Sequence, residues 1–186
     1  MRRFLVSLVF LALAVGLTGC AANRYSAEFA SSPNAPYTLG SGDRVRVIVF
    51  GQDSLSNSYA VDGSGNIFMP LIGIVPAEGK TIEGLSRAIA AKLRNGYLRD
   101  PQVSVEVEAY RPFFILGEVT TPGQYPYING MTAEKAVAVA GGFTPRGYKG
   151  SVDLTRVING HPITGQVPLT QIVRPGDTIV VQERYF

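Results

Sequence analysis

The sequence contains very little of the side-chain chemistry from which many active sites are built. It has one cysteine, Cys20, and one histidine, His161, among 186 residues. A single cysteine excludes an intramolecular disulfide. A single histidine that precedes Pro162 in a turn-rich segment gives no basis for a Ser-His-Asp set or a histidine metal cluster, and a surface position is expected for it. We therefore predict no catalytic residues, no metal, no cofactor and no enzyme activity.

The chain also lacks a large excess of charge of either sign. Its formal net charge is +3, and this value falls to about +1 if the first 19 residues, which include Arg2 and Arg3, are removed. Proteins that bind nucleic acids usually carry a clear basic patch, because phosphate contacts supply most of their affinity. The sequence therefore predicts no nucleic-acid partner.

Long apolar runs are absent except at the start of the chain, where Met1-Arg2-Arg3 precedes an apolar stretch from Phe4 to Leu17. At about 14 residues this stretch is too short to span a bilayer comfortably, and a charged start before it is typical of a secretory signal peptide. The following Leu17-Thr18-Gly19-Cys20 resembles a bacterial lipobox, which implies cleavage before Cys20 and acylation of that residue. Two or three acyl chains, each contributing about 0.8 kcal/mol per buried methylene, would hold the protein on a membrane. Ala21, in place of aspartate, implies sorting to the outer membrane.

The remaining 167 residues are divided by composition into a polar segment and two ordered units. Residues 20–36 show no apolar period, which is typical of an extended tether. In residues 37–110, alternating valines predict strands at 44–49 and 103–107, and a five-residue turn at 62–66 predicts a hairpin between residues 59–61 and 67–69. Thr81 is placed to cap a helix that ends near Gly96.

The second unit, residues 111–183, repeats a mixed pattern. A buried strand at 113–116, a turn at Thr121-Pro122-Gly123 and a return strand are followed by a short helix between Thr132 and Gly141-Gly142. Further strands are expected at 152–156 and 178–181. Two hairpin strands, one helix and later strands are the order of a β-grasp. The predicted fold class is therefore α+β: a first domain of short strands with one helix, then a β-grasp domain.

Two segments resemble each other within the chain: Gly40-Ser41-Gly42-Asp43 before the strand at 44–49, and Pro175-Gly176-Asp177 before the strand at 178–181. In each, glycine permits a tight turn and the aspartate can accept hydrogen bonds from the amides of its own turn. We interpret this similarity as shared turn chemistry.

An ordered series of motifs identifies the chain as resembling the Wza-like polysaccharide export lipoproteins. Tyr37-Thr38-Leu39-Gly40-Ser41-Gly42-Asp43, Pro70-Leu71-Ile72-Gly73 and Asp100-Pro101-Gln102-Val103 are similar to the export domain of that family. Gly117-Glu118-Val119, Pro122-Gly123-Gln124-Tyr125, Ala140-Gly141-Gly142 and Pro175-Gly176-Asp177 are similar to its soluble-ligand-binding β-grasp (SLBB) domain. The structural-motif residues that the resemblance selects are Gly42, Asp43, Gly65, Pro70, Gly73, Pro101, Gly117, Pro122, Gly123, Gly141, Gly142, Gly176 and Asp177.

The resemblance implies a homo-oligomeric ring on the periplasmic face of the outer membrane, anchored through acylated Cys20, that passes capsular or exopolysaccharide outward. It also implies an inner-membrane polysaccharide co-polymerase or tyrosine kinase as a partner. The sequence ends at Tyr185-Phe186 without the amphipathic C-terminal helix of the large members, so a separate outer-membrane pore protein is a further expected partner.

Two other functions are compatible with the residues. A lipid-anchored glycan-binding or sensing module is one, because Tyr125, Tyr127 and Tyr148 could present ring faces to sugars, although core or interface packing explains them equally well. A polysaccharide hydrolase or lyase is the other, since Glu106 and Glu108 form an acidic pair. Both glutamates are expected on the outer face of a strand, where solvated charge is the usual explanation.

Overall fold

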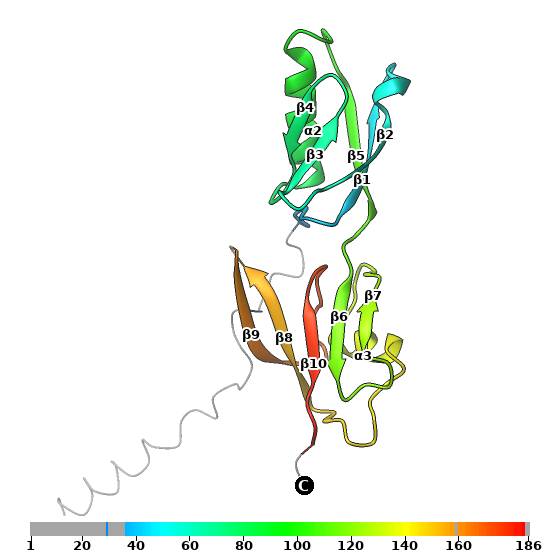
Figure 1. Ribbon diagram of the computed structural model, residues 1–186, viewed down its shortest axis with the longest axis vertical. Helices are drawn as coiled ribbons and strands as arrows, with labels where there is room; N and C mark the ends of the chain where they lie inside the picture. The colour runs from blue at the N-terminus through cyan, green and yellow to red at the C-terminus, as the bar shows by residue number, and fades with distance from the viewer. Residues whose placement is uncertain (1–28, 30–35, 159, 185–186) are drawn as a thin grey trace, which may run out of the picture.

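The computed structural model describes residue 29, residues 36–158 and residues 160–184, which form two lobes stacked along the long axis of the molecule (Figure 1). The predicted signal peptide, Cys20 and the predicted tether, apart from Phe29 and Pro36, lie outside these residues. No helix among the described residues is long and apolar enough to cross a membrane.

The first lobe contains two small sheets and one long helix. Strands β1 (Arg44–Val49), β2 (Asn57–Ala60) and β5 (Val103–Ala109) form an antiparallel sheet in the order β2-β1-β5, with the short 3-10 helix Asp53–Leu55 between β1 and β2. Strands β3 (Asn66–Met69) and β4 (Gly73–Pro76) form a separate hairpin, and α2 (Ile82–Arg94) connects it to β5. The predicted strands at 44–49 and 103–107 and the predicted helix are confirmed.

The core of this lobe forms because strand and helix periods place apolar side chains on facing surfaces. Val45, Val47 and Val49 alternate inward from β1, and the α2 stripe of Leu85, Ile89 and Leu93 is fully buried in the same core. The Thr81 hydroxyl accepts a hydrogen bond from the Gly84 amide at 3.2 Å, which caps the helix as predicted. At the other end, Gly96 has a φ of +97°, in the left-handed region that glycine tolerates.

One hairpin prediction is wrong. The segments before and after residues 62–66 do not pair with each other: β2 pairs with β1, and β3 pairs with β4. The Asp62 carboxylate accepts hydrogen bonds from the amides of Ser64 and Asn66, and two backbone hydrogen bonds within residues 62–66 also close the turn, so it forms without a ladder between the flanking strands. This turn carries the chain from one sheet to the other, and Tyr59 and Ile67 enter the same core from different sheets.

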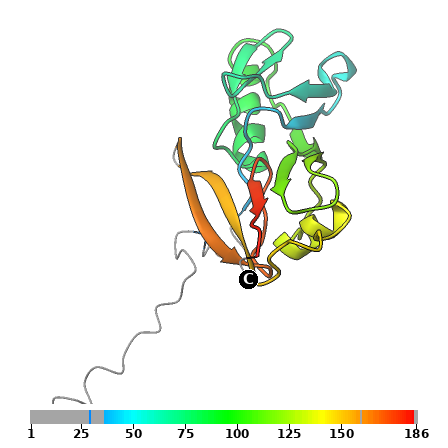
Figure 2. The same ribbon diagram turned by 60° about the horizontal axis from the view of Figure 1, so that its bottom comes forward.

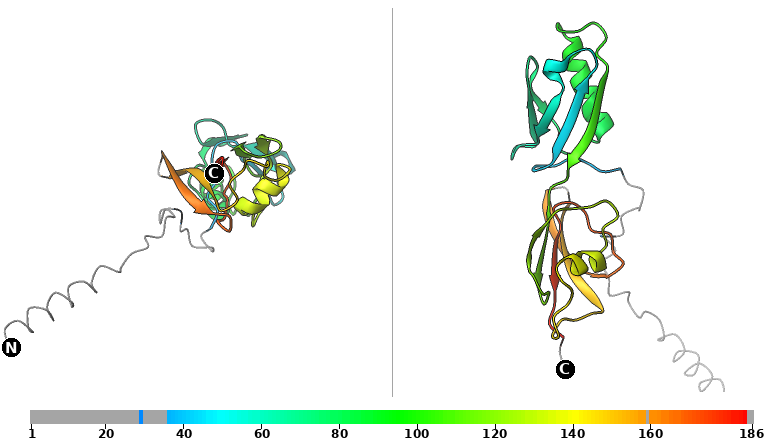
Figure 3. Two further views of the ribbon diagram at one scale, coloured as in Figure 1. Left: turned by 90° about the horizontal axis from the view of Figure 1, so that it is seen from below. Right: turned by 90° about the vertical axis from the view of Figure 1, so that its right-hand side faces the viewer.

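The second lobe is a five-stranded sheet with one helix on one face (Figure 3). Its strands are β6 (Phe113–Gly117), β7 (Gly123–Tyr125), β8 (Ser151–Ile158), β9 (His161–Pro168) and β10 (Thr178–Val181), in the order β7-β6-β10-β8-β9. The first and last of these strands in sequence, β6 and β10, lie parallel and adjacent within the sheet. Helix α3 (Ala133–Val139) is rich in alanine, and its small side chains share a buried core with Ile115 and Ile179. The predicted β-grasp is confirmed.

The sequence pattern does not indicate strand β9, because Pro162 and Pro168 interrupt it. It pairs only with β8 and is an edge strand of the sheet, where the missing amide of proline costs no ladder hydrogen bond. His161 is exposed at the start of this strand, as expected for a surface histidine.

One residue of the predicted tether is packed into the second lobe. Phe29 is fully buried in the β-grasp core, its carbonyl accepts a hydrogen bond from the side-chain amide of Gln171 at 3.0 Å, and the Arg156 guanidinium lies 5.7 Å from its ring centre. The sequence pattern gave no sign of this contact, since an isolated aromatic residue has no periodicity. The segment between the predicted lipid site and the first lobe is therefore fixed to the second lobe at this point.

Two glycines of the β-grasp lobe allow a test of its backbone geometry. Gly142 has a φ of +85°, and a Cβ added there would meet no neighbouring atom, whereas a Cβ on Gly117, at φ +82°, would lie 2.2 Å from the Val181 carbonyl oxygen. We expect Gly142→Ala to lower the free energy of unfolding by about 1–2 kcal/mol through conformation alone. Gly117→Ala should cost more, because β6 and β10 must also move apart. Urea unfolding measures both.

The matched control is Gly63→Ala, at a position with open space and no positive φ. This variant should keep the free energy of unfolding of the parent protein. Equal stability of the Gly117 and Gly63 variants would contradict the described close approach of β6 and β10.

Candidate functional site: the cleft between the lobes

Two turns of the same construction face the junction between the lobes. Asp43 and Asp177 are almost completely buried, and each ends a turn whose preceding glycine has a positive φ, +92° at Gly42 and +85° at Gly176. The Asp43 carboxylate accepts from the Gly40 amide at 2.8 Å, and the Asp177 carboxylate accepts from the Arg174 amide at 2.7 Å. The similarity between the two segments in sequence therefore corresponds to one local geometry that occurs once in each lobe.

Arg111 connects these two turns. Its amide donates to Asp43 Oδ1 at 2.7 Å and its Nη1 donates to Asp43 Oδ2 at 3.3 Å, while its Nε donates to the Pro175 carbonyl at 3.1 Å. The residue lies in the connection between β5 and β6, where the chain passes from one lobe to the other (Figure 2). One side chain thus holds the turn of the first lobe against the turn of the second.

The turn glycines make room for this side chain. A Cβ on Gly40 would lie 2.1 Å from Arg111 Nη1, and a Cβ on Gly176 would lie 2.7 Å from its Nε. Larger residues at either position would displace the guanidinium from its partners. The glycines therefore serve the contact between the lobes as well as the turns themselves.

A second ion pair closes the turn of the β-grasp lobe. Arg156 Nε donates to Asp177 Oδ1 at 2.9 Å and its Nη2 donates to Oδ2 at 2.7 Å, a two-point contact between side chains that are 6% and 1% exposed. The same Nη2 reaches the Ile172 carbonyl at 3.0 Å. A buried carboxylate is tolerated here because both of its oxygens are hydrogen-bonded to a cation.

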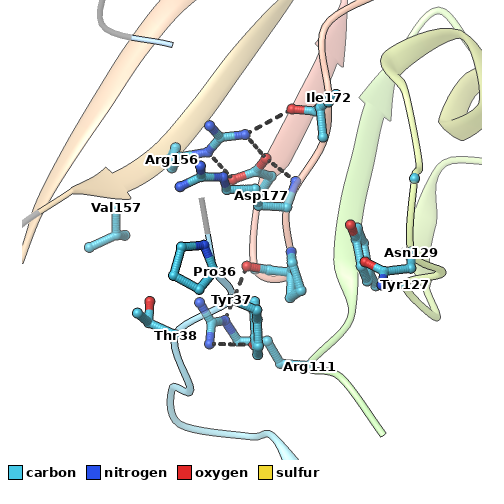
Figure 4. Close-up of a pocket in the computed structure, with 14 residues that line it drawn as sticks. Pro36, Tyr37, Thr38, Arg111, Tyr127, Asn129, Arg156, Val157, Ile172 and Asp177 are labelled. Atoms are coloured by element: carbon cyan, nitrogen blue, oxygen red, sulfur yellow. Dashed lines mark hydrogen bonds and ion pairs between the residues drawn. The ribbon is translucent and has the colours of Figure 1, made fainter. Parts of the chain in front are cut away.

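These residues border a cleft of about 310 Å³ between the lobes (Figure 4). Tyr37 and Arg111 enter it from the junction, and Arg156 and Tyr127 enter it from the β-grasp lobe. The full lining consists of Pro36, Tyr37, Thr38, Arg111, Tyr127, Asn129, Gly130, Arg156, Val157, Ile172, Arg174, Pro175, Gly176 and Asp177. Because the two lobes both contribute, neither lobe alone forms this site.

Three tyrosines form a chain of edge-to-face contacts along the junction. The ring centres of Tyr37 and Tyr110 are 4.9 Å apart, and those of Tyr110 and Tyr127 are 5.4 Å apart. The Tyr37 hydroxyl donates to Asp43 Oδ2 at 2.5 Å and accepts from Arg111 Nη1 at 3.2 Å. Burial, and then the hydrogen bond to Asp43, raise the pKa of Tyr37, and burial also raises the pKa of Tyr127. Both hydroxyls therefore stay protonated at neutral pH.

Of the predicted motif residues, only Gly42, Asp43, Gly176 and Asp177 lie at this junction. The others take structural positions distributed over both lobes. Gly65, Gly73, Gly117, Gly141 and Gly142 have positive φ angles, Pro70 directly follows β3, Pro101 is buried just before β5, and Pro122 and Gly123 form the turn into β7.

The three candidate tyrosines separate in space. Tyr127 lines the cleft, Tyr125 stacks on Phe113 in the β-grasp core at 6.0 Å between ring centres, and Tyr148 lies at the surface outside the cleft. The acidic pair considered for glycoside hydrolysis lies on β5, where Glu108 contacts Ser58 and Arg46, and these two contacts lower the pKa of Glu108. No group of three or more potential metal ligands occurs among the described residues.

Arg111, Arg156 and Arg174 were not singled out from the sequence. A single arginine before a proline carries no periodic signal, and the partners of Arg111 lie 64 and 68 positions away in the chain. The pair of Gly-Asp turns is the one feature of the sequence that could have indicated nearby arginines, because a buried aspartate at a turn requires a cation or several amides around it.

Comparison with known families agrees with this arrangement of two lobes. A family model described as polysaccharide biosynthesis/export protein matches residues 31–108, and an SLBB domain model matches residues 112–167. The chain therefore contains a region similar to the polysaccharide biosynthesis/export domain, followed by a region similar to an SLBB domain. The family resemblance expected from the sequence motifs is thereby confirmed.

Three named relatives illustrate the range of the family. The chain is 39% identical to the exopolysaccharide production protein ExoF of Rhizobium meliloti over 57% of its own length and 28% of that protein. It is 29% identical to the EPS I polysaccharide export outer membrane protein EpsA of Ralstonia nicotianae, covering 80% of this chain and 48% of the relative. It is 28% identical to the polysialic acid transport protein KpsD of Escherichia coli, covering 81% and 29%. The chain thus spans less than half the length of each relative.

The buried pair in the β-grasp turn gives a test of stability. Arg156→Met leaves the Asp177 carboxylate buried without its cation, so we expect the free energy of unfolding to fall by about 3–5 kcal/mol. Adding Asp177→Asn should recover part of this loss, because the uncompensated charge is then gone. The matched control is Arg146→Met, which removes the exposed ion pair with Glu183 and should change stability little. Equal losses for Arg156→Met and Arg146→Met would contradict the described burial.

The raised pKa of Tyr37 predicts a loss of stability at alkaline pH. Above the unfolded-state pKa of about 10, the unfolded chain releases the phenolic proton while the folded protein retains it, so the free energy of unfolding falls as pH rises. Tyr37→Phe should be less stable than the parent at neutral pH, because hydrogen bonds are lost, but its stability should fall less steeply as the pH passes through about 10. Urea unfolding across this range measures the slope.

Exposed Tyr97 provides the control, because Tyr97→Phe removes a phenol that lies on the surface. That variant should keep the slope of the parent protein. A Tyr37→Phe slope identical to the parent slope would show that Tyr37 is not the group responsible.

Proposed function

We propose that this protein is a subunit of a polysaccharide export assembly, anchored by acylated Cys20 to the periplasmic face of the outer membrane. The observation that carries the proposal is the succession of an export-family domain and an SLBB domain over most of the chain. We assign the export domain to residues 37–110 and the β-grasp domain to residues 111–183. The names of the relatives support the same role, since they refer to production, export or transport of polysaccharides.

The position of Phe29 supports an orientation for the anchored protein. Only eight residues separate Cys20 from Phe29, so the chain between them spans at most roughly 30 Å. Because Phe29 is buried in the β-grasp core, an acyl group on Cys20 would keep that lobe close to the membrane. In this proposal the export domain extends further into the periplasm.

Assembly into a closed ring is part of the proposal, because a chain of this size whose strands and helices fill its own two cores cannot enclose a hydrated polymer. Cyclic symmetry with a head-to-tail contact closes such a ring. Exposed apolar side chains support contacts between subunits: Phe68, Leu71 and Ile74 are 60–72% exposed on the β3–β4 hairpin, and Leu71 has a positive φ of 67°. Exposed apolar patches of this kind mark interaction surfaces.

A partner in the inner membrane, a co-polymerase or tyrosine kinase, would deliver the polymer, and a separate outer-membrane pore protein would complete the route outward. A lipid-anchored glycan-binding module is the second candidate function. The cleft between the lobes favours it, because that cleft combines arginines, tyrosines and apolar side chains in one concave site.

One complementation experiment tests anchoring, assembly and export together. In cells that lack the protein we expect loss of surface polysaccharide, restored by the parent protein, with cross-linking in intact cells producing a ladder above the dimer. Cys20→Ser should leave the protein uncleaved or unanchored in membrane fractions and should not restore export. The control variant is Ser54→Cys, which exchanges serine and cysteine at an exposed position away from the predicted anchor. It should fractionate with the membrane and restore export as the parent protein does.

Normal polysaccharide export in the deletion strain, with a strictly monomeric protein in wild-type cells, would contradict the export role. Fractionation of Cys20→Ser as a mature outer-membrane lipoprotein would contradict the anchor alone.

A further inference from the structure

The three arginines that line the cleft differ in their partners. Arg111 pairs with Asp43 and Arg156 pairs with Asp177, so each of these charges is matched. The Arg174 guanidinium forms no ion pair and no hydrogen bond with any residue in the described part of the chain, although its backbone amide is bound to Asp177. Three cations against two carboxylates leave the cleft with one unmatched positive charge.

This unmatched charge is held in an unfavourable place. Arg174 is half-buried, and burial first, then the neighbouring Arg156, lower its pKa, while the nearby Asp177 carboxylate offsets part of this effect. An arginine nevertheless keeps its proton at all physiological pH values. The cleft therefore holds a partly desolvated guanidinium beside a second guanidinium, and an anion that entered would compensate for the lost hydration and for the repulsion between the two cations.

The rest of the lining is suited to a sugar. Tyr127 and Asn129 provide a hydroxyl and an amide in the same cleft as Arg174, while Val157 and Ile172, both exposed at the surface, provide apolar area. Sugars carry hydroxyls on their rims and C–H groups on their faces, so they match walls that combine polar groups with apolar ones. A volume of about 310 Å³ is at the lower end of the range for ligand pockets, about 300–1,000 Å³.

We propose that the cleft binds an oxyanion carried by a sugar, with Arg174 as the residue that contacts the negative group and with Tyr127 and Asn129 contacting the sugar. The identity of that sugar as part of an exported polysaccharide rests on the proposed function. The oxyanion has two chemical sources, a carboxylate on an acidic residue of the polymer or a phosphate that links a sugar to its carrier. A neutral sugar of the same size lacks the group that Arg174 recognises.

Titration of the purified full-length protein in detergent, at low salt, tests this site. The probes are trigalacturonic acid, glucose 1-phosphate and neutral maltotriose, and isothermal titration calorimetry measures their affinities. We expect at least one of the two anionic probes to bind at least about tenfold more tightly than maltotriose, with affinity that falls as salt is added. The tighter anionic probe identifies the source of the oxyanion.

Arg174→Gln should lower the affinity for that anionic probe by about tenfold or more and leave the affinity for maltotriose unchanged. Arg94→Gln removes an exposed arginine at the end of α2 in the other lobe, and this matched control should bind as the parent does. Arg174→Lys keeps the charge and should retain part of the affinity. A thermal melt of each variant shows whether it is folded. If Arg174→Gln is unfolded, the affinity of Arg174→Lys for the anionic probe provides the test in its place.

Equal affinity of all three probes for the parent protein would overturn the proposal, as would equal affinity of the parent and Arg174→Gln for the anionic probe. These binding outcomes do not test the export role, which is tested by measuring polysaccharide export in the deletion strain. Selective binding by a protein whose deletion leaves export intact would support the site and contradict the proposed function.

Discussion

The burial of the Asp43 carboxylate is the constraint on which the arrangement of this protein depends. A carboxylate removed from water is strongly unfavourable unless its oxygens are hydrogen-bonded. Asp43 accepts hydrogen bonds from the Tyr37 hydroxyl, the Gly40 amide, and both the amide and the guanidinium of Arg111. Since the Arg111 side chain also donates to Pro175 of the other lobe, movement of the lobes apart would either break the hydrogen bond to Pro175 or draw the guanidinium away from the buried Asp43 carboxylate.

This polar junction differs in kind from the two lobes that it connects. Each lobe has a separate cluster of buried apolar side chains, and Arg111 contributes to neither. Hydrophobic burial is non-directional, so it would stabilise the lobes without fixing the angle between them. Hydrogen bonds to a planar guanidinium are directional, and they give the junction a defined geometry. Together with the edge-to-face contacts of Tyr37, Tyr110 and Tyr127, these hydrogen bonds set the orientation of the lobes and the shape of the cleft.

The sequence by itself determined the local structure, because the necessary information lies within a few residues. Alternating valines in β1, the cap at Thr81 and the glycines after α3 specify strand, helix start and helix end through contacts at short separation. Those patterns, in order, also indicated the family. The pairing of β3 with β4 in place of β2 could not be read in this way, because the Asp62 turn is compatible with either partner and packing in the core decides between them.

Only the tertiary structure decided the site. Arg111, Arg156 and Arg174 have no distinguishing neighbours in sequence, and their roles come from partners brought together across 16 to 68 positions, or, for Arg174, from the lack of a paired carboxylate among the described residues. Phe29 likewise gained a role only through the β-grasp core in which it is buried. Charge pairing and burial depend on which residues surround a side chain in three dimensions. The local sequence therefore shows where a charged or apolar residue occurs, but not which residues it will contact.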